Sequence, residues 1–255
     1  MKTALTIAGS DPTGGAGLQA DLMVFKALGV NGVSIVSIIT AQNTEGVVDI
    51  YELPAGSLAS QITTLLNDLK PDALKTGMLY TTDNVTIISE HIESYALKNL
   101  VIDPVTVSST GVPLAGEGLT EALKKYLFPL ARVITPNINE AALFSGVNIR
   151  SDKDLKEAAV RLMGLGPKSV IITGGHMKDT AMDLLYDGEE FMTLENDQIY
   201  GEFHGTGCAF SAAITACLAL GYSLKESFIE AKDVVYKAMK SAKSPGKGLK
   251  ILNIK

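Results

Sequence analysis

Residues 3–28 read TALTIAGSDPTGGAGLQADLMVFKAL and contain a strand, a glycine-rich turn and a helix in immediate succession. Thr3–Ala8 is an apolar run typical of a buried strand, and apolar residues then recur at helical spacing over Gly17–Leu28. Gly29 is a usual stop for such a helix. This order of elements predicts the first unit of an α/β fold.

The same alternation of strand and helix continues along the chain. The expected strands are Val33–Thr40, Ala73–Thr76, Leu100–Ile102, Val133–Thr135 and Val170–Thr173, and the expected helices are Leu58–Leu69, Asp83–Tyr95, Leu119–Leu127, Asp152–Leu165, Thr206–Leu220 and Lys225–Ala242. Asp183–Tyr186 and Glu190–Leu194 are joined across an Asp-Gly pair and predict a hairpin. We therefore expect one domain over residues 1–255, with a mostly parallel sheet covered by helices on both faces.

The composition of the 255-residue chain argues against several classes of protein. The 22 basic and 28 acidic residues give a net charge of −6, which disfavours binding to nucleic acid or to an anionic membrane. Gly205–Leu224 carries no charge over 20 residues, enough to span a bilayer, but its many small residues favour a buried helix. The apolar N-terminal run ends at Asp11 and Pro12, too early for a signal peptide.

The two cysteines, Cys208 and Cys217, lie nine positions apart on one expected helix and are too distant to form a disulfide. A reducing compartment is the simplest interpretation, so we expect a cytoplasmic protein. Cys217 is interpreted as a core residue.

The first candidate site is the glycine turn after the first strand. Gly15–Ala20 fits the G-x-G-x-x-A form of a dinucleotide-binding turn, but the second strand ends at Thr40–Asn43 without an acid to hold a ribose. A tight strand–helix turn and a close approach of backbone to a ligand are the alternatives. A nicotinamide oxidoreductase is therefore only a minor hypothesis.

The second candidate is His204-Gly205-Thr206-Gly207-Cys208, at the start of the uncharged helix. Unpaired amides and the helix dipole at such a start form a site for an anion such as a transferring phosphate. Cys208 lies in the first turn, where the positive helix end is expected to lower the pKa of a thiol. The alternative is an ordinary helix start with a small buried cysteine.

The third candidate combines Asp103 with Asn137 and Glu140, which follow two other strands. Carboxylates at strand ends can hold Mg²⁺. From these residues alone, however, a capping box between Asn137 and Glu140 is favoured. His176 and His204 lie beside glycine loops and are candidates for ligand contact. The sequence contains no P-loop, H-E-x-x-H, C-x-x-C or G-x-S-x-G motif, which argues against the enzyme classes that use them.

Seven of these segments together resemble one family. IAGSDPTGGAGLQAD, TAQNTEGV, KTGML, VIDPV, ITPNINEA, ITGGH and HGTGCAFSAA occur in the order seen in hydroxymethylpyrimidine and hydroxymethylpyrimidine-phosphate kinases. These are thiamine-pathway members of the ribokinase-like superfamily, close to bacterial pyridoxine/pyridoxal kinases. The resemblance runs from about Leu5 to Tyr236.

The resemblance implies a ribokinase-like three-layer α/β/α sandwich with a mostly parallel central sheet and a small β-hairpin. It implies transfer of a phosphoryl group from ATP, with Mg²⁺, to 4-amino-5-hydroxymethyl-2-methylpyrimidine and then to its monophosphate. A pyridoxal/pyridoxine kinase of vitamin B6 salvage is the alternative, and a catalytically silent ligand-binding protein on the same fold is another. Relatives are often homodimers, which we also expect here.

The resemblance also assigns roles to residues. The substrate ring is expected to be hydrogen-bonded by Asp21 and Gln42, in a pocket shaped by Gly9, Met78 and Val105. Phosphoryl transfer is assigned to the anion hole Gly205, Thr206 and Gly207 and to Cys208, which either takes the hydroxyl proton late or only orients the hydroxyl. Mg²⁺ is assigned to Glu140 and Asp103, and the nucleotide to Asn137, Thr173, Gly175, His176 and Lys247. The resemblance thereby reverses the preference for the capping interpretation of Glu140.

The chain departs from the family pattern at two positions. Thr173 stands where the family often has lysine before the paired glycines, and Ser109 stands where it often has lysine in A-K-S-G. Both changes remove a cation near the expected phosphate region and bear on the second phosphorylation, whose substrate is already charged. Threonine before the glycines also occurs in pyridoxal kinases, whereas Gln42 in its A-Q-N-T segment favours the pyrimidine.

Overall fold

The computed structural model describes residues 1–54, 56–177 and 180–255, and leaves the side chains of residues 175–177, 180 and 181 undescribed. In the described part, nine strands form one sheet in the order β3-β2-β1-β4-β5-β6-β7-β8-β9. The strands are β1 (Thr3–Ser10), β2 (Asn31–Asn43), β3 (Gly46–Glu52), β4 (Ala73–Thr76), β5 (Leu100–Ile102), β6 (Val133–Ile134), β7 (Val170–Met177), β8 (Thr180–Tyr186) and β9 (Phe191–Asp197). The six from β2 to β7 in this order are parallel, and the edges β3 and β8–β9 are antiparallel.

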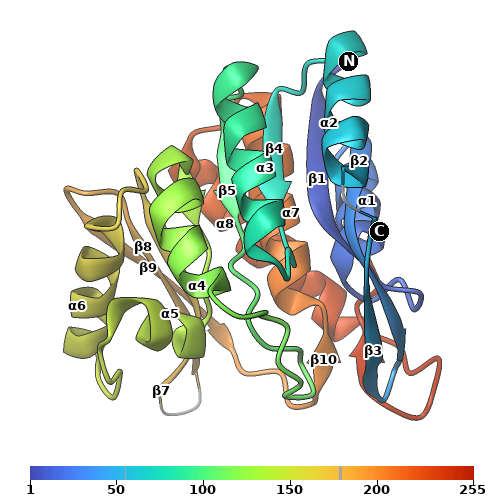
Figure 1. Ribbon diagram of the computed structural model, residues 1–255. Helices are drawn as coiled ribbons and strands as arrows, with labels where there is room; N and C mark the ends of the chain where they lie inside the picture. Colours follow the sequence, from blue (N-terminus) through green and yellow to red (C-terminus); the bar gives the residue numbers. More distant parts are fainter. Residues whose placement is uncertain (55, 178–179) are drawn as a thin grey trace.

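Helices cover both faces of the sheet, which makes the expected three layers (Figure 1). One face carries α1 (Gly17–Ala27), α7 (Thr206–Leu220) and α8 (Leu224–Lys240), and the other carries α2 (Ser57–Asp68), α3 (Thr82–Ser94), α4 (Leu119–Ala122), α5 (Ile138–Ser145) and α6 (Asp152–Met163). Successive strand residues alternate between the two cores because side chains of a strand point to opposite faces. Ala4 and Ala73 pack with α7, whereas Leu5 and Leu74 pack on the other side.

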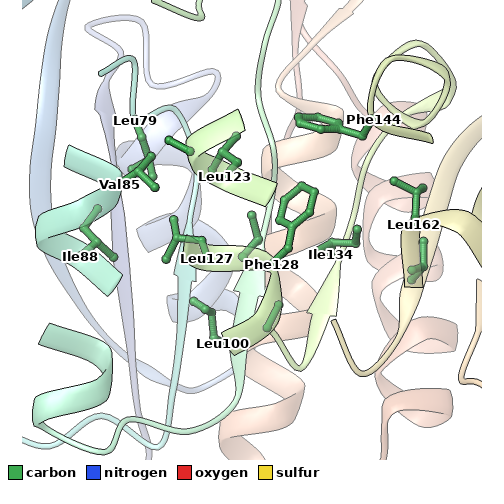
Figure 2. Packing of buried hydrophobic residues seen from close by; sticks show 14 of the residues in the cluster. Leu79, Val85, Ile88, Leu100, Leu123, Leu127, Phe128, Ile134, Phe144 and Leu162 are labelled. Atoms are coloured by element: carbon green, nitrogen blue, oxygen red, sulfur yellow. The ribbon is translucent and has the colours of Figure 1, made fainter. Parts of the chain in front are cut away.

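The core on the α2–α6 side is built from large aliphatic and aromatic side chains. Figure 2 shows Leu127 and Phe128 at its centre, with Phe144 from α5 and Leu162 from α6 beside them. Phe128 and Phe144 meet edge to face with ring centroids 5.2 Å apart. This packing fixes α5, and therefore the end of β6 that precedes it, against the sheet.

Helix α7 is buried all round, as its uncharged sequence predicts. Every residue from Ala209 to Ala219 is buried between the sheet, α1 and α8. Among the described helices, none combines the length and the apolar composition needed to cross a bilayer. The helix begins after Gly205 and ends at Gly221, both in the left-handed region with φ of 82° and 96°, where glycine is strongly favoured.

Several parts of the chain differ from the expected elements. β3 was not expected, because its apolar side chains face outward: Val48 is 82% exposed and Tyr51 is 53% exposed. For α5 the sequence predicted only the capping box at its start, Asn137 with Glu140, because the helix itself is short. The helix expected over Leu119–Leu127 is an α-helix only to Ala122 and continues as a π-helical turn.

A small parallel pair ties the C-terminus to the site. β10 (Phe203–His204) directly precedes α7 and pairs with β11 (Lys250–Ile251). The carboxyl ends of the parallel strands open on the same side of the sheet, where ligands of such folds bind.

Candidate active site

A cavity of about 730 Å³ lies at the carboxyl ends of the parallel strands, within the size range of small-molecule sites. It brings together most of the residues that the sequence singled out. Its lining includes Gly9, Asp21, Gln42, Met78, Asp103, Val105, Asn137, Glu140, Thr173, Gly205, Thr206, Gly207 and Cys208. The expected substrate, phosphate and metal residues therefore share one space.

The N-terminus of α7 forms one wall of this cavity. No described side chain caps the helix, so its first amides are available to a ligand. Gly205 cannot carry a side chain, because a Cβ there would lie 1.8 Å from the carbonyl oxygen of Gly15. A Cβ on Gly207, in contrast, would have Asp103 Oδ2 as its nearest neighbour, 3.9 Å away. Gly207 therefore faces open space in front of the helix.

The glycine turn after β1 serves this same wall. A Cβ on Gly17 would lie 2.4 Å from the carbonyl oxygen of Gly9, and the carbonyl of Gly15 abuts Gly205. The turn is held by Asp11, whose carboxylate accepts hydrogen bonds from the amides of Thr13 and Ala16 at 2.8 Å each. Its glycines are thus explained by close backbone packing rather than by a dinucleotide site.

Cys208 lies in the first turn of α7 and is half-buried. Burial raises the pKa of its thiol to about 12, and the carboxylates of Asp103 and Asp21 add to this rise while Lys75 opposes it. The expectation of a lowered thiol pKa is therefore wrong, because desolvation and two nearby carboxylates outweigh the helix dipole. At neutral pH the thiol is protonated and is no ready-made base.

An ionic network that the sequence analysis missed lies beneath Cys208. Lys75 in β4 is fully buried and donates to Asp21 Oδ1 at 2.7 Å and to Ser211 Oγ at 2.8 Å. Ser211 in turn donates to Asp103 Oδ2 at 3.0 Å. Burial alone would lower the pKa of Lys75, but the nearby carboxylates of Asp21 and Asp103 raise it above its ordinary value. Lys75 therefore stays charged under the helix terminus.

This network corrects the expectation for Asp21. Its side chain is completely buried, and its second oxygen, Oδ2, accepts a hydrogen bond of 2.6 Å from Thr6. The carboxylate is thus committed to Lys75 and Thr6 rather than to a substrate ring. The sequence did offer one indication of this network: Lys75 is a charged residue within a short strand, Ala73–Thr76, whose other residues are uncharged.

Asn137 and Glu140 form the capping box that the resemblance had led us to set aside. Asn137 Oδ1 accepts from the amide of Glu140, and Glu140 Oε2 accepts from the amide of Asn137, each at 3.0 Å. Glu140 Oε1 also accepts from the amide of Thr106 at 3.2 Å. Burial, followed by repulsion from Asp103, raises the pKa of Glu140 to about 8. Two mutually repelling carboxyl groups therefore face the cavity.

The structure places Lys247 outside the cavity, so its contact with the nucleotide stays a prediction. Lys247 is exposed on the loop before β11 and is not among the cavity residues. The flanking glycines pack on the turn between β2 and β3: the amide of Gly248 donates to Thr44 Oγ1 at 3.2 Å, and a Cβ there would lie 1.9 Å from the carbonyl oxygen of Thr44. Figure 1 shows this loop beside β3, at the β3 edge of the sheet. These glycines therefore allow the loop before β11 to pack closely against the turn between β2 and β3.

The other expected nucleotide residues lie near β7. Thr173 lines the cavity, and its amide donates to the carbonyl of Pro136 at 3.0 Å. Gly175 and His176 fall within β7, but their side-chain positions lie outside the described residues.

A pair that was not expected lies at this end of the cavity. Asp183 Oδ1 accepts from the amide of Gly174 at 2.9 Å, and Asp183 Oδ2 accepts from Lys232 of α8 at 2.8 Å. Both side chains line the cavity. Lys232 thus places a cation close to Thr173, where the family often has a lysine. Lys232 lies on α8, 49 positions from Asp183 in the chain, so no local sequence pattern indicated this pair.

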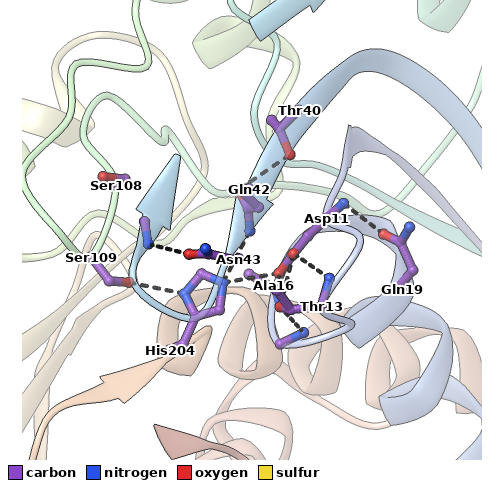
Figure 3. Close-up of polar contacts among 12 residues, drawn as sticks. Asp11, Thr13, Ala16, Gln19, Thr40, Gln42, Asn43, Ser108, Ser109 and His204 are labelled. Atoms are coloured by element: carbon purple, nitrogen blue, oxygen red, sulfur yellow. Dashed lines mark hydrogen bonds and ion pairs between the residues drawn. The ribbon is translucent and has the colours of Figure 1, made fainter. Parts of the chain in front are cut away.

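His204 lies between the substrate-ring residues and the helix terminus (Figure 3). Its Nε2 is 2.9 Å from Asp11 Oδ2 and 3.3 Å from the Gln42 amide, and its Nδ1 is 3.5 Å from Ser109 Oγ. Its placement in the cavity agrees with its choice as a ligand candidate.

The chain is similar to several known proteins. Residues 11–253 match the family described as phosphomethylpyrimidine kinase. The hydroxymethylpyrimidine/phosphomethylpyrimidine kinase of Bacillus subtilis is 41% identical over 248 residues, which cover 96% of this chain and 92% of that protein. The thiamine biosynthesis bifunctional protein ThiED of Geobacter sulfurreducens is 40% identical over 96% of this chain, which spans 50% of its length. The ADP complex of Bacillus subtilis pyridoxal kinase has a TM-score of 0.92 and 38% identity, covering 100% of this chain and 97% of that one.

Proposed function

The chain belongs to the phosphomethylpyrimidine kinase family, and we propose that it phosphorylates 4-amino-5-hydroxymethyl-2-methylpyrimidine and then its monophosphate, with ATP, in thiamine biosynthesis. The observation that carries this proposal is the single cavity that joins the uncapped amides of α7 to the side chains of Gln42 and Met78. One end can hold a phosphoryl group, and the other can hold a polar aromatic ring.

The ring end is built for a flat substrate. Gln42 offers both a donor and an acceptor to ring nitrogens. Met78 and Val105 provide apolar walls, and Met78 is adaptable in shape. The space around Gly9 is narrow, since a Cβ there would lie 2.8 Å from Ile38 and 3.3 Å from the Met78 sulfur. A side chain at position 9 would therefore push these walls into the ring space.

At the phosphoryl end, transfer needs alignment and charge neutralisation more than a strong base, because the transition state is loose. The amides of Thr206, Gly207 and Cys208 are fixed by the helix and require no reorganisation as charge develops. The Lys75 ammonium lies 3.4 Å from the carbonyl of Cys208 and adds positive charge beneath them. The protonated Cys208 thiol orients the acceptor hydroxyl, whose proton leaves to an oxygen of the transferred phosphoryl group or to water.

Asp103 and Glu140 fit a Mg²⁺ ion. Burial, followed by repulsion from Asp103, raises the pKa of Glu140, and a divalent cation held by these two residues would offset that repulsion. The described residues contain no cluster of three or more His, Cys, Asp or Glu side chains able to hold a metal. The ion would therefore be held largely by water and phosphate oxygens, as Mg²⁺ often is. When bound, it neutralises phosphate charge.

Pyridoxal phosphorylation is the second candidate. It is favoured by the similarity to Bacillus subtilis pyridoxal kinase and by Thr173 in place of the common lysine. Gln42 favours the pyrimidine, because the aminopyrimidine presents adjacent donor and acceptor groups that match an amide.

Product identification tests the proposal. Incubation with ATP, Mg²⁺ and the pyrimidine alcohol is expected to give a phosphate monoester on the hydroxymethyl oxygen and one ADP per ester, detected by phosphorus NMR and mass spectrometry. ATP hydrolysis without an ester, or an ester formed equally without the protein, would contradict it.

Replacing the thiol separates binding from turnover. We expect Cys208→Ser to keep the dissociation constant of the pyrimidine within about twofold, because the thiol is not placed among the ring contacts. We expect kcat to fall about 100-fold, because the shorter serine side chain no longer holds the acceptor hydroxyl in line, and a misplacement of about 1 Å can cost this factor. Calorimetry measures the dissociation constant, and a coupled ADP assay measures kcat.

Cys217→Ser is the matched control, since Cys217 lies fully buried on the same helix and away from the cavity. It is expected to lose stability but to keep kcat. An unchanged kcat in Cys208→Ser would remove the role of the thiol in orienting the hydroxyl and leave the anion hole.

A further inference from the structure

Ser211 places a buried hydroxyl group on α7, which packs against β4 and β5. In β4, Lys75 lies two positions after Ala73, which packs with α7. Asp103, just after β5, likewise lies two positions after Val101, which also packs with α7. Because side chains two positions apart in a strand point to the same face, Lys75 and Asp103 both face this helix. The hydroxyl of Ser211 therefore meets one lysine and one aspartate.

Lys75 fixes the direction in which the Ser211 hydroxyl donates. Lys75 Nζ lies 2.8 Å from Ser211 Oγ, and an ammonium group can only donate. The same Nζ is held in place by Asp21 Oδ1 at 2.7 Å. Ser211 Oγ therefore accepts from Lys75, and its single proton is left for a different partner.

Two acceptors lie within reach of that proton. Asp103 Oδ2 is 3.0 Å from Ser211 Oγ, and the carbonyl oxygen of Cys208 is 3.1 Å from it. As a metal ligand, Asp103 is a carboxylate, and a hydrogen bond to a charged acceptor is about twice as strong as one between neutral groups. The Cys208 carbonyl also has Lys75 as a donor at 3.4 Å. The proton of Ser211 therefore goes to Asp103 Oδ2.

Asp103 itself lies at the phosphoryl end of the cavity. The residue lines the cavity, and its Oδ2 is the nearest atom to the Cβ position of Gly207, at 3.9 Å. Oδ2 is held by Ser211, whereas Oδ1 has no hydrogen-bond partner within residues 1–54, 56–177 and 180–255. The carboxyl group is thus anchored through one oxygen and keeps the other available.

We infer that Ser211 is a positioning residue for the metal ion: its hydroxyl, directed by Lys75, holds Asp103 Oδ2 and leaves Oδ1 for a divalent cation that accompanies the nucleotide. This inference rests on the proposed function, which assigns Asp103 to Mg²⁺. Ser211 is not among the residues that line the cavity, so it acts only through Asp103. Partners that hydrogen-bond a metal ligand typically contribute about 10–100-fold to metal affinity or activity.

Ser211→Ala tests the inference, because it removes the hydroxyl that holds Asp103 Oδ2. The probe is Mn²⁺, which also prefers oxygen ligands and is detected by electron paramagnetic resonance. We expect the dissociation constant of Mn²⁺ for the protein–ADP complex to rise about tenfold. The dissociation constant of ADP without metal, measured by calorimetry, is expected to stay within about twofold. In turnover, the Mg²⁺ concentration that gives half of the maximal rate is expected to rise similarly, with KM for the pyrimidine unchanged.

Ser227→Ala is the matched control. Ser227 is also fully buried, but it lies on α8, away from the cavity, and its hydroxyl donates to the carbonyl of Ser223 at 2.7 Å. Like Ser211→Ala, it loses one buried hydroxyl and the stability that goes with it. Its Mn²⁺ affinity is expected to stay within about twofold of that of the unmodified protein.

Two further variants show whether Ser211 acts through Asp103. Ser211→Cys keeps a weaker donor in a similar volume, and its Mn²⁺ affinity is expected to lie between those of the unmodified protein and Ser211→Ala. In an Asp103→Asn background, adding Ser211→Ala is expected to weaken Mn²⁺ binding by less than about twofold, because residues that act on one ligand are not additive.

The outcomes separate this inference from the proposed function. A Mn²⁺ affinity that falls in Ser211→Ala, is kept in Ser227→Ala and falls no further in the double variant supports the inference. A Mn²⁺ affinity unchanged in Ser211→Ala, or lowered equally in the Asp103→Asn background, overturns it, and the proposed function stands if the unmodified protein phosphorylates the pyrimidine. An unmodified protein that phosphorylates neither alcohol overturns the proposed function, and an absence of Mn²⁺ binding with ADP overturns both the metal assignment and the role of Ser211.

Discussion

Gly207→Val is expected to fold normally and to lose about 10²–10³-fold in kcat, the loss typical of removing one donor from an oxyanion-type site. The new side chain would project from the first turn of α7 into open space, with Asp103 Oδ2 as the nearest neighbour of its Cβ at 3.9 Å. The Cβ itself is therefore accommodated without a close contact. The space that valine fills is the space in which the proposed function places the phosphoryl group.

Gly207→Ala is the graded control. Its smaller side chain is expected to cost less activity, and its stability is expected to rise by up to about 1 kcal/mol, because glycine is a poor residue within a helix. Activity follows from coupled ADP release and stability from urea unfolding. A folded Gly207→Val variant with nearly unchanged kcat would show that the phosphoryl group does not approach these amides.

Lys75→Met is expected to destabilise the protein by about 3–5 kcal/mol, the cost of breaking a buried ion pair by removing one partner. Lys75 and Asp21 are both fully buried and 2.7 Å apart. Without the ammonium, Asp21 is left as an uncompensated buried carboxylate. Ser211, which links Lys75 to Asp103, loses its donor at the same time.

The double variant Lys75→Met/Asp21→Asn distinguishes charge from packing. Removing both charges is expected to recover at least half of the lost stability, since a buried pair replaced as a unit costs much less than a broken one. Lys124→Met, at a surface pair with Glu121, is the matched lysine control and is expected to change stability by less than about 1 kcal/mol. Urea unfolding gives all three values. A loss below about 1 kcal/mol in Lys75→Met would contradict the charged network.

The sequence predicted the elements whose pattern is purely local. Helix α7 was expected with its observed bounds, Thr206–Leu220, because a glycine precedes it, a glycine ends it and no charge interrupts it. The hairpin β8–β9 followed from an Asp-Gly turn. β3 could not be found in this way, because its exposed valine and tyrosine give no buried face to recognise.

The sequence predicted which loops form the site, but not the pKa values and ionic partners of its buried side chains. The pKa of Cys208 is raised by its burial and by carboxylates from two other elements, and neither the burial nor those distances can be read from the position of a cysteine in a helix. Asp21 was assigned to the ring by the resemblance, and its partner Lys75, 54 positions away in the chain, could not be found from local sequence. Lys247 was assigned to the nucleotide by a loose match, and the structure shows that the glycines beside it pack against another loop.

The measurement that tests the central claim most directly is ADP release with four acceptors: the hydroxymethylpyrimidine, its monophosphate, pyridoxal and pyridoxine. A single helix terminus facing Gln42 predicts the highest kcat/KM for the hydroxymethylpyrimidine, with release that requires the acceptor and Mg²⁺. ADP release that is independent of any acceptor, or fastest with pyridoxal, would contradict this account.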